Sequence, residues 1–239
     1  MIIKNLLAST QLAELNDCLS KEFNWSSHQL TGNTKDFSFK HNKEYIGEDK
    51  PNLDKKIINA LNVNEAWRDY VVAPKLSGEI LFLKYEKNSL YKYHADVAKG
   101  SPVTQTYSNT LFLSDPEEYE GGELVLTINN EEIEYKLPRN TLLTYPVGCK
   151  HRVNKVTEGT RKVAIFWTES WIKDESDRNL IRDLSEIYNQ LYLSYEELNL
   201  TNTQKDSFRN ILIDLTRLTE RIHNKYPRWR DPRNFLLSD

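Results

Sequence analysis

The sequence predicts a mixed α+β fold, mainly β, in which a sandwich or jelly roll is flanked by helices at both ends of the chain. Residues 76–170 hold short apolar runs separated by turn residues, a pattern typical of antiparallel sandwiches. Residues 1–75 mix helical and extended patterns, whereas residues 172–239 follow helical periodicity. We therefore expect residues 1–172 to form the jelly-roll domain with its N-terminal helices. We expect residues 173–239 to form a C-terminal helical extension packed on that core.

Two helices are expected before the β-rich region. Ser9-Thr10 would cap the first helix, because leucines follow at spacings of three and four residues. The second helix would run from Lys55 to Trp67, with apolar residues at similar spacing. Between them, the segment from Asn24 to Asn52 is polar and predicts a loop or an edge strand.

The β-rich region divides into apolar runs of strand length. The expected strands are Glu79–Tyr85, Thr106–Leu113, Glu123–Ile128, Glu131–Leu137, Thr141–Tyr145 and Arg161–Trp167. Asn129-Asn130 predicts a hairpin turn, since asparagine tolerates the positive φ of tight turns. The spacing of these runs favours strands over long helices.

The last region predicts two amphipathic helices, at Asp174–Leu193 and Thr203–His223. Each carries one apolar stripe, so each needs a hydrophobic partner surface. They would pack on the β core or form the interface of a homodimer.

Composition limits the function. The chain has 239 residues and a net charge of -3, so we expect no general attraction to nucleic acid. Two isolated cysteines indicate a reducing compartment such as the cytoplasm. The apolar run at residues 1–7 is too short for a signal peptide, and no stretch approaches the ~20 apolar residues of a membrane span. We expect a soluble protein that does not associate with a membrane.

Two histidines and one aspartate indicate a metal site. His94 and Asp96 are two residues apart, which would place both side chains on one face of a strand. His151 would join them from a later strand. Two imidazoles and one carboxylate form the facial triad of non-haem Fe(II), which leaves positions open for reagents. His28, His41 and His223 occupy polar or helical contexts and predict structural or solvated roles.

Arg161 follows His151 by ten positions. Its guanidinium would bind the distal carboxylate of 2-oxoglutarate chelating the iron. Strand alternation places Arg161 on one face with Val163, Ile165 and Trp167, so this face would line the cavity. The alternative is an edge salt bridge to Glu158 or Glu169. Cys149 offers a thiolate near His151, but a small buried side chain is the favoured interpretation.

Several segments resemble the prolyl 4-hydroxylase-like Fe(II)/2-oxoglutarate dioxygenases, and look closest to their PKHD-type hydroxylases. The similarity covers residues 75–185 well. The segments that carry it are Tyr91–Asp96, Asn109–Leu124 with its Gly-Gly-Glu motif, Leu137-Pro138, Thr144–Pro146, His151–Arg161 and Phe166–Asp174.

The resemblance implies a double-stranded β-helix core flanked by helices. It implies Fe(II) held by His94, Asp96 and His151, with 2-oxoglutarate at Arg161, O2 as the oxidant and L-ascorbic acid as a further cofactor. Tyr85 matches a tyrosine that lies near the co-substrate in relatives, although ordinary strand packing explains it equally well. Phe112 departs from the family, because several prolyl hydroxylases carry a co-substrate-binding tyrosine there.

Together these features predict an oxidoreductase that hydroxylates an unactivated C–H bond with O2 and 2-oxoglutarate, releasing succinate and CO2. The substrate would be peptidyl proline, another amino-acid residue or a small metabolite. Three alternatives remain at this level: a nucleic-acid demethylase, a cupin-like isomerase or non-enzymatic jelly-roll binding module, and a helical interaction protein with an inactive core. For Gly121-Gly122 a simple turn is favoured over substrate contact, and Lys92, Tyr93 and Arg152 would face the substrate entrance or solvent.

Overall fold

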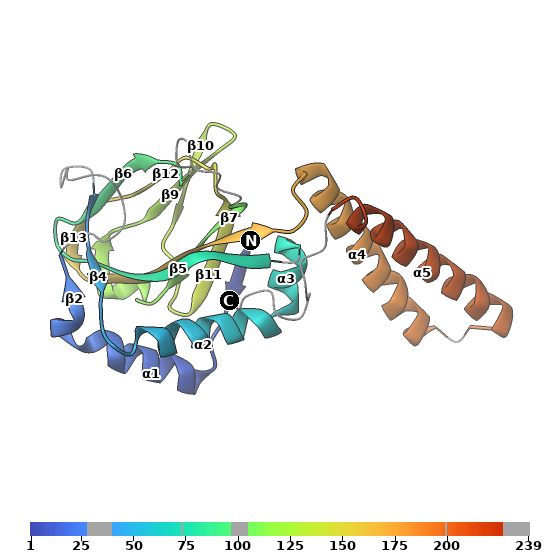
Figure 1. Ribbon diagram of the computed structural model, residues 1–239, viewed down its shortest axis with the longest axis horizontal. Helices are drawn as coiled ribbons and strands as arrows, with labels where there is room; N and C mark the ends of the chain where they lie inside the picture. The colour runs from blue at the N-terminus through green and yellow to red at the C-terminus, as the bar shows by residue number, and fades with distance from the viewer. Residues whose placement is uncertain (28–39, 73, 97–104, 199, 227–239) are drawn as a thin grey trace.

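The computed structural model describes residues 1–27, 40–72, 74–96, 105–198 and 200–226. Two antiparallel sheets lie face to face, helices cover one of them, and a helical hairpin extends from the end (Figure 1). The predicted jelly-roll core with flanking helices is therefore confirmed. In the described part of the chain, the sheets form an open sandwich and do not close into a barrel.

The larger sheet has seven strands, with β14 and β5 near its centre. In spatial order the strands are β1 (Ile2–Lys4), β11 (Thr141–Pro146), β7 (Tyr107–Phe112), β14 (Arg161–Ser170), β5 (Pro74–Tyr85), β4 (Lys43–Tyr45) and β2 (Trp25–Ser26). The register places Arg161 directly opposite Tyr85. These two residues, far apart in the sequence, are thereby brought together.

The smaller sheet has five strands and faces the inner side of the larger one. In spatial order they are β10 (Glu131–Tyr135), β9 (Leu124–Ile128), β12 (His151–Val153), β6 (Leu90–His94) and β3 (Lys40–His41). A separate pair joins β13 (Val156–Gly159) to β8 (Tyr119–Gly121). The predicted hairpin at Asn129-Asn130 is confirmed, and both residues have positive φ.

Alternation along β5 generates two separate cores. Ile80 and Phe82 point outward and pack against the N-terminal helices. Leu81, Leu83 and Tyr85 point inward, between the two sheets. Because successive side chains on a strand face opposite sides, one continuous apolar run serves both cores.

The N-terminal helices differ from the prediction in their ends. They are α1 (Ser9–Ser20), α2 (Lys50–Val63) and α3 (Glu65–Val71), with two single-turn 3-10 helices elsewhere at Glu22–Asn24 and Pro116–Glu118. The expected cap at Ser9-Thr10 was wrong, because the cap position is Ala8 and the Gln11 side chain accepts its N–H at 3.0 Å.

The helix expected at Lys55–Trp67 is in fact two helices. The chain turns extended at Asn64, whose side chain accepts the backbone N–H of Trp67 at 2.9 Å. This cap starts a new helix, since it satisfies a donor that the first turn leaves unpaired. In the polar segment Asn24–Asn52, the described parts contain β2, β3, β4 and the start of α2, whereas residues 28–39, including His28, lie outside the described residues.

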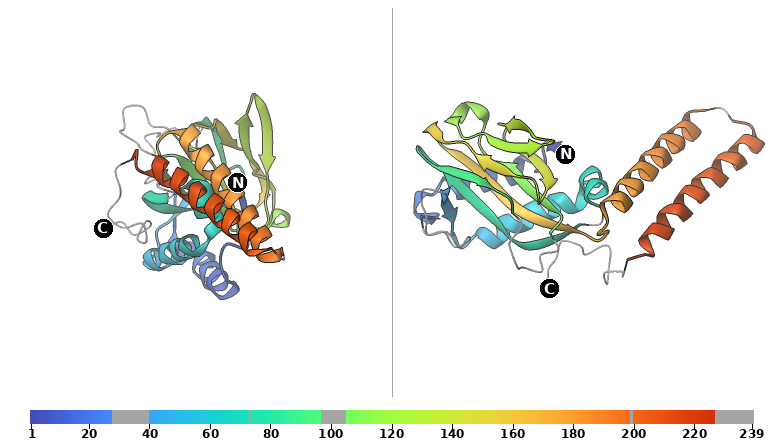
Figure 2. Two further views of the ribbon diagram at one scale, coloured as in Figure 1. Left: turned by 90° about the vertical axis from the view of Figure 1, so that its right-hand side faces the viewer. Right: turned by 90° about the horizontal axis from the view of Figure 1, so that it is seen from above.

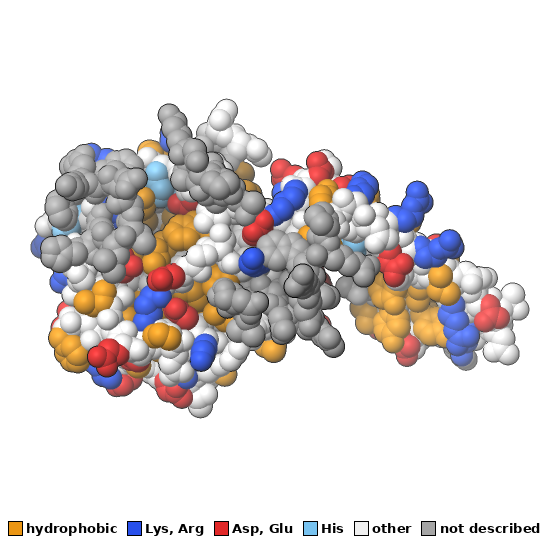
Figure 3. All heavy atoms as spheres, viewed as in Figure 1, with side chains coloured by type: hydrophobic (Ala, Val, Ile, Leu, Met, Phe, Trp, Pro, Cys, Tyr) orange, Lys and Arg blue, Asp and Glu red, His pale blue; other side chains and the backbone are white. Residues whose placement is uncertain are grey.

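The last two helices, α4 (Glu175–Glu197) and α5 (Asn202–His223), form a hairpin that projects away from the sheets (Figures 1 and 2). Near its base, Ile181, Leu184 and Ile222 pack against Val72 and Ile172. Farther out, large apolar side chains are exposed, and Figure 3 shows hydrophobic atoms gathered on one face of the hairpin. No helix in the described parts combines the length and apolarity that a membrane span requires.

Candidate active site

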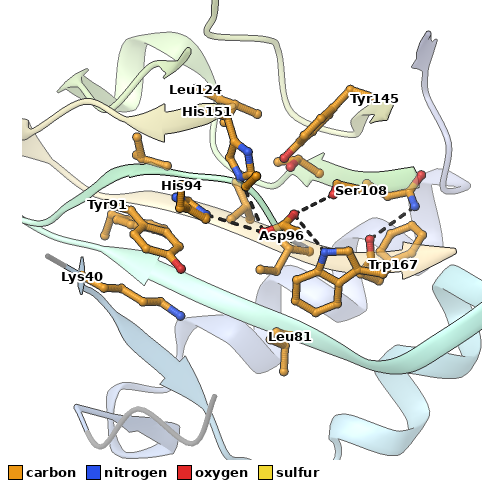
Figure 4. A pocket seen from close by; sticks show the side chains of 18 of the residues that line it. Lys40, Leu81, Tyr91, His94, Asp96, Ser108, Leu124, Tyr145, His151 and Trp167 are labelled. Carbon is orange, nitrogen blue, oxygen red and sulfur yellow. Dashed lines mark hydrogen bonds and ion pairs between the residues drawn. The ribbon is translucent and has the colours of Figure 1, made fainter. Parts of the chain in front are cut away.

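A cavity of about 320 Å³ lies between the two sheets (Figure 4). Its walls come from β3, β5, β6, β7, β9, β11, β12 and β14. They include Lys40, Tyr85, Tyr91, His94, Asp96, Ser108, Tyr145, His151, Arg161, Val163, Ile165 and Trp167. The face expected for Arg161, Val163, Ile165 and Trp167 therefore does line one cavity.

His94, Asp96 and His151 meet at this cavity, with one potential ligand atom of each within 4.8 Å of the others. His94 ends β6 and lies directly opposite His151, the first residue of β12. Asp96 follows just after β6 ends, so the predicted placement of both ligands on one regular strand was wrong. Asp96 Oδ1 still lies 3.6 Å from Nε2 of His94 and 3.7 Å from Nε2 of His151.

The backbone orients both imidazoles. Nδ1 of His94 is 2.8 Å from the carbonyl oxygen of Lys92, and Nδ1 of His151 is 2.9 Å from that of Cys149. A carbonyl can only accept, so each Nδ1 carries the hydrogen and each Nε2 presents a lone pair. Metal-binding histidines are typically held by such outer hydrogen bonds.

Asp96 is fixed by two donors that the sequence did not reveal. Ser108 Oγ donates to Oδ2 at 2.6 Å and Trp167 Nε1 donates to the same oxygen at 2.9 Å (Figure 4). Oδ1 is left to face the histidines. Burial acts to raise the pKa of Asp96, but the neighbouring imidazoles of His94 and His151 and these two donors lower it to about 2. The carboxylate is therefore ionised at neutral pH.

Aromatic rings enclose the histidines. The ring of Tyr91 stacks on His94 with centroids 3.6 Å apart, and the ring of Tyr145 meets His151 edge-on at 5.4 Å. Burial lowers the pKa of His151 below its ordinary value of 6.5. A neutral imidazole is the form that binds a metal ion, so the surroundings favour ligation.

Arg161 lies in the same cavity but in a different environment. Only 2% of it is exposed, and its guanidinium carbon lies 5.1 Å from the ring centre of Tyr85 and 5.6 Å from that of Phe112. Its Nε and Nη1 are buried without a hydrogen-bond partner among the described residues. The alternative salt bridge is not formed in the described parts, where Glu169 pairs with Lys173 and Glu158 is exposed.

Tyr85 is buried and lines the cavity next to Arg161. Burial raises its pKa to about 12, so the hydroxyl stays protonated and can donate a hydrogen bond. It also packs in the inner core. The position of Tyr85 is therefore compatible both with contact to the co-substrate and with ordinary strand packing.

Other residues singled out in the sequence direct their side chains to partners other than the metal ligands. Cys149 is a free, half-buried thiol 3.4 Å from the carbonyl of Thr127. Tyr93 hydrogen-bonds to Glu132, which also pairs with Arg152 at 2.8 Å. These contacts form a polar cluster on the smaller sheet.

The remaining histidines and glycines have structural surroundings. His41 is exposed on β3, and His223 stacks on Trp171 with centroids 5.5 Å apart. Gly121 and Gly122 both have positive φ, and a Cβ on Gly121 would lie 2.1 Å from the carbonyl oxygen of Lys155. This close approach explains the glycine at position 121.

Comparison with known proteins identifies the class that this fold and site define. The 2OG-Fe(II) oxygenase superfamily matches residues 80–169. A PKHD-type hydroxylase of Acinetobacter baumannii (strain SDF) is 32% identical over 221 residues, covering 87% of this chain and 96% of the relative. A PKHD-type hydroxylase of Picosynechococcus is 40% identical over 132 residues, covering 55% of this chain and 60% of the relative. The chain belongs to the PKHD-type hydroxylases and is an Fe(II)/2-oxoglutarate-dependent dioxygenase by family.

Solved structures support the fold. A prolyl-4-hydroxylase of Pseudomonas putida matches with a TM-score of 0.55 at 14% identity, over 71% of this chain and 91% of that one. A Trichoplax adhaerens prolyl hydroxylase in complex with a hypoxia inducible factor peptide fragment matches with a TM-score of 0.52 at 19% identity, over 75% and 86%. HygX of Streptomyces hygroscopicus, with nickel and 2-oxoglutarate bound, matches with a TM-score of 0.50 at 14% identity, over 71% of this chain and 82% of that one.

Proposed function

We propose that His94, Asp96 and His151 hold Fe(II), and that Arg161 binds the distal carboxylate of 2-oxoglutarate. The protein would use them to hydroxylate an unactivated C–H bond. The observation that carries this proposal is that one cavity holds a converging His-Asp-His set and a buried guanidinium whose Nε and Nη1 have no partner among the described residues.

The residues fit both groups chemically. Two neutral imidazoles and one carboxylate suit Fe(II) and leave open positions. A buried guanidinium without an anion is costly, and a carboxylate matches its fork of donors. When bound, the iron, 2-oxoglutarate and O2 together supply the oxidising power for C–H hydroxylation, with succinate and CO2 as products.

The chain contributes positioning and exclusion of water. Ser108 and Trp167 hold Asp96 so that Oδ1 faces the histidines. Tyr91 and Tyr145 cover the imidazoles. Arg161 would orient 2-oxoglutarate by its distal end, because its own position is fixed between two aromatic rings. Ascorbate enters the proposal only as a reductant that keeps the iron ferrous.

The substrate would be a peptidyl residue, proline or another amino acid. The cavity of about 320 Å³ lies at the small end of ligand pockets, which span about 300–1,000 Å³. Once 2-oxoglutarate occupies part of it, the remaining space suits one side chain reaching in from a larger molecule. The peptide bound to the Trichoplax enzyme is a precedent in the same fold. The alternative is hydroxylation of a small metabolite.

Three further predictions belong to this proposal. Residues 1–172 would act as the catalytic domain and residues 173–239 as a helical extension. The exposed apolar face of the α4–α5 hairpin would support a homodimer, which light scattering after size exclusion would detect. The free thiols Cys18 and Cys149 favour a reducing compartment such as the cytoplasm.

Succinate production tests the proposed function. Purified protein with Fe(II), O2 and 2-oxoglutarate is screened against peptide pools and metabolite pools, and a true substrate should gain the mass of one oxygen. His151→Ala should abolish succinate release, whereas His41→Ala, which changes an exposed side chain that does not line the cavity, should retain it. Equal release by the two variants would refute the assignment.

A further inference from the structure

We propose that the Tyr119 hydroxyl is a second donor to the distal carboxylate of 2-oxoglutarate, beside Arg161. It would supply the hydroxyl that Phe112 lacks. This inference rests on the proposed function, because it takes 2-oxoglutarate as the ligand of Arg161. It assigns a co-substrate contact to the strand that ends in the Gly-Gly motif.

Backbone pairing places Tyr119 beside Arg161. Tyr119 begins β8 and lies opposite Gly159, the last residue of β13. The next residue, Thr160, donates its N–H to the carbonyl of Glu118 at 3.3 Å, and β14 then begins at Arg161. The Tyr119 side chain belongs to the inner core between the sheets, together with Tyr85 and Phe112.

Two glycines make room for this arrangement. Gly122 has a φ of +68°, and a Cβ there would lie 3.1 Å from two ring carbons of Tyr119. Gly159 has a φ of +74°, and its Cβ would lie 2.1 Å from the carbonyl oxygen of Glu118. Larger residues at these positions would displace the ring or separate β8 from β13. The glycine at position 122 therefore leaves space for the ring of Tyr119.

A lysine holds Tyr119 from the other side. Lys136 Nζ donates to the carbonyl of Tyr119 at 2.7 Å, and the same ammonium lies 4.6 Å from the centre of its ring. The backbone and the ring of Tyr119 are thus fixed by contacts that leave its hydroxyl unused.

The hydroxyl is buried and has no acceptor. Tyr119 is 2% exposed, and its OH has no hydrogen-bond partner among the described residues. Burial raises the pKa of Tyr119, and the nearby Arg161 charge acts in the opposite direction. The Tyr119 hydroxyl and the guanidinium are therefore neighbours. The hydroxyl oxygen can accept from a guanidinium N–H, but the hydrogen of the hydroxyl has no acceptor on Arg161, because a guanidinium has donors only.

Such a pair calls for an anion. A carboxylate has about four lone-pair sites and accepts from a guanidinium and a hydroxyl at once. Tyr119 is neutral, so it adds a hydrogen bond without adding charge. Arg161 would supply most of the attraction for the carboxylate. Tyr119 would increase the affinity for ligands whose distal carboxylate reaches this part of the cavity.

Tyr119→Phe tests the inference, since it removes one oxygen atom and keeps the ring. Dissociation constants are measured anaerobically on Fe(II)-loaded protein for two keto acids, 2-oxoglutarate and 2-oxopentanoate. The second has the same carbon chain without the distal carboxylate and is titrated at millimolar concentrations. We expect 2-oxoglutarate to bind about tenfold more weakly, with binding of 2-oxopentanoate and of the metal unchanged. Tyr135→Phe, on β10, is the matched control and should leave every constant unchanged.

Two results would overturn the inference: unchanged 2-oxoglutarate affinity, or equal losses for both keto acids. Arg161→Met separates this failure from failure of the proposed function. If Arg161→Met loses 2-oxoglutarate affinity and Tyr119→Phe does not, only the role of Tyr119 is wrong. If Arg161→Met binds 2-oxoglutarate as the parent protein does, the proposed function itself fails.

Discussion

The two charged groups of the cavity differ in what the protein provides for them. Asp96 receives hydrogen bonds from Ser108 and Trp167 and faces two histidines. Arg161 lies between aromatic rings, and two of its nitrogens lack partners among the described residues. The metal end is thus built by the protein, whereas the arginine end requires a ligand to complete it. This difference indicates where each reagent binds.

The largest effect is expected at the metal end. Asp96→Ala should weaken Co(II) or Mn(II) binding by more than about 100-fold, because it removes the only charged ligand of the set. Ser108→Ala, which removes one donor to that carboxylate, should weaken binding by about tenfold. Anaerobic calorimetry measures both. Near-parental affinity in Asp96→Ala would place the metal elsewhere.

Removing the charge of Arg161 should weaken ligand binding without lowering the stability of the ligand-free protein. Arg161→Met should weaken 2-oxoglutarate binding by about 100-fold, the cost of losing a charged and desolvated contact. Without ligand, the same variant should unfold at an equal or higher urea concentration, since it removes a buried charge that lacks partners. Marked destabilisation of the ligand-free variant would show that the protein itself satisfies Arg161.

The β8–β13 pairing supports the arginine end and can be broken selectively. Gly159→Ala should lower the free energy of unfolding by about 2–3 kcal/mol, because positive φ and a carbonyl at 2.1 Å both oppose a Cβ. Gly148→Ala is the control, since no atom lies within 4 Å of its added Cβ, and it should change stability by less than about 0.5 kcal/mol. Urea denaturation compares the two, and equal effects would contradict the account.

A smaller effect is expected from pH. Burial lowers the pKa of His151 in the folded protein below 6.5, so the unfolded chain takes up this proton first. Metal-free protein should therefore lose stability as the pH falls below 6.5. In His151→Gln this part of the loss should disappear. Identical slopes of unfolding free energy against pH, in variant and parent, would show that burial does not suppress protonation.

Much of the β core could be predicted because alternation is a local property. The strand at Glu79–Tyr85 was predicted from its short apolar run, and the face carrying Arg161 and Trp167 from period-two alternation; the two occur in β5 and β14. The convergence of His94 with His151 was also predicted, although it depends on cross-strand register, which the pattern of one segment does not encode. There the residue types of a facial triad, two imidazoles and one carboxylate, supplied what periodicity could not.

Other features depend on contacts between distant segments, which the sequence pattern does not specify. Ser108 is one serine within a strand, and nothing in its neighbours indicates that it meets Asp96. The division of one expected helix at Asn64 follows from a side-chain cap that competes with helix continuation. Tyr119 becomes notable only when the pairing of β8 with β13 sets it beside Arg161. An amphipathic stripe predicts that α4 and α5 need a partner but does not name it.

The central claim is that three side chains hold one ferrous ion within reach of 2-oxoglutarate bound at Arg161. Anaerobic titration of Fe(II)-loaded protein with 2-oxoglutarate tests it most directly, through the charge-transfer absorbance of the chelate. We predict a saturable band with one equivalent in the parent protein, no band in His151→Ala, and a band in Arg161→Met only at about 100-fold higher 2-oxoglutarate. A band of full intensity in His151→Ala would contradict the account.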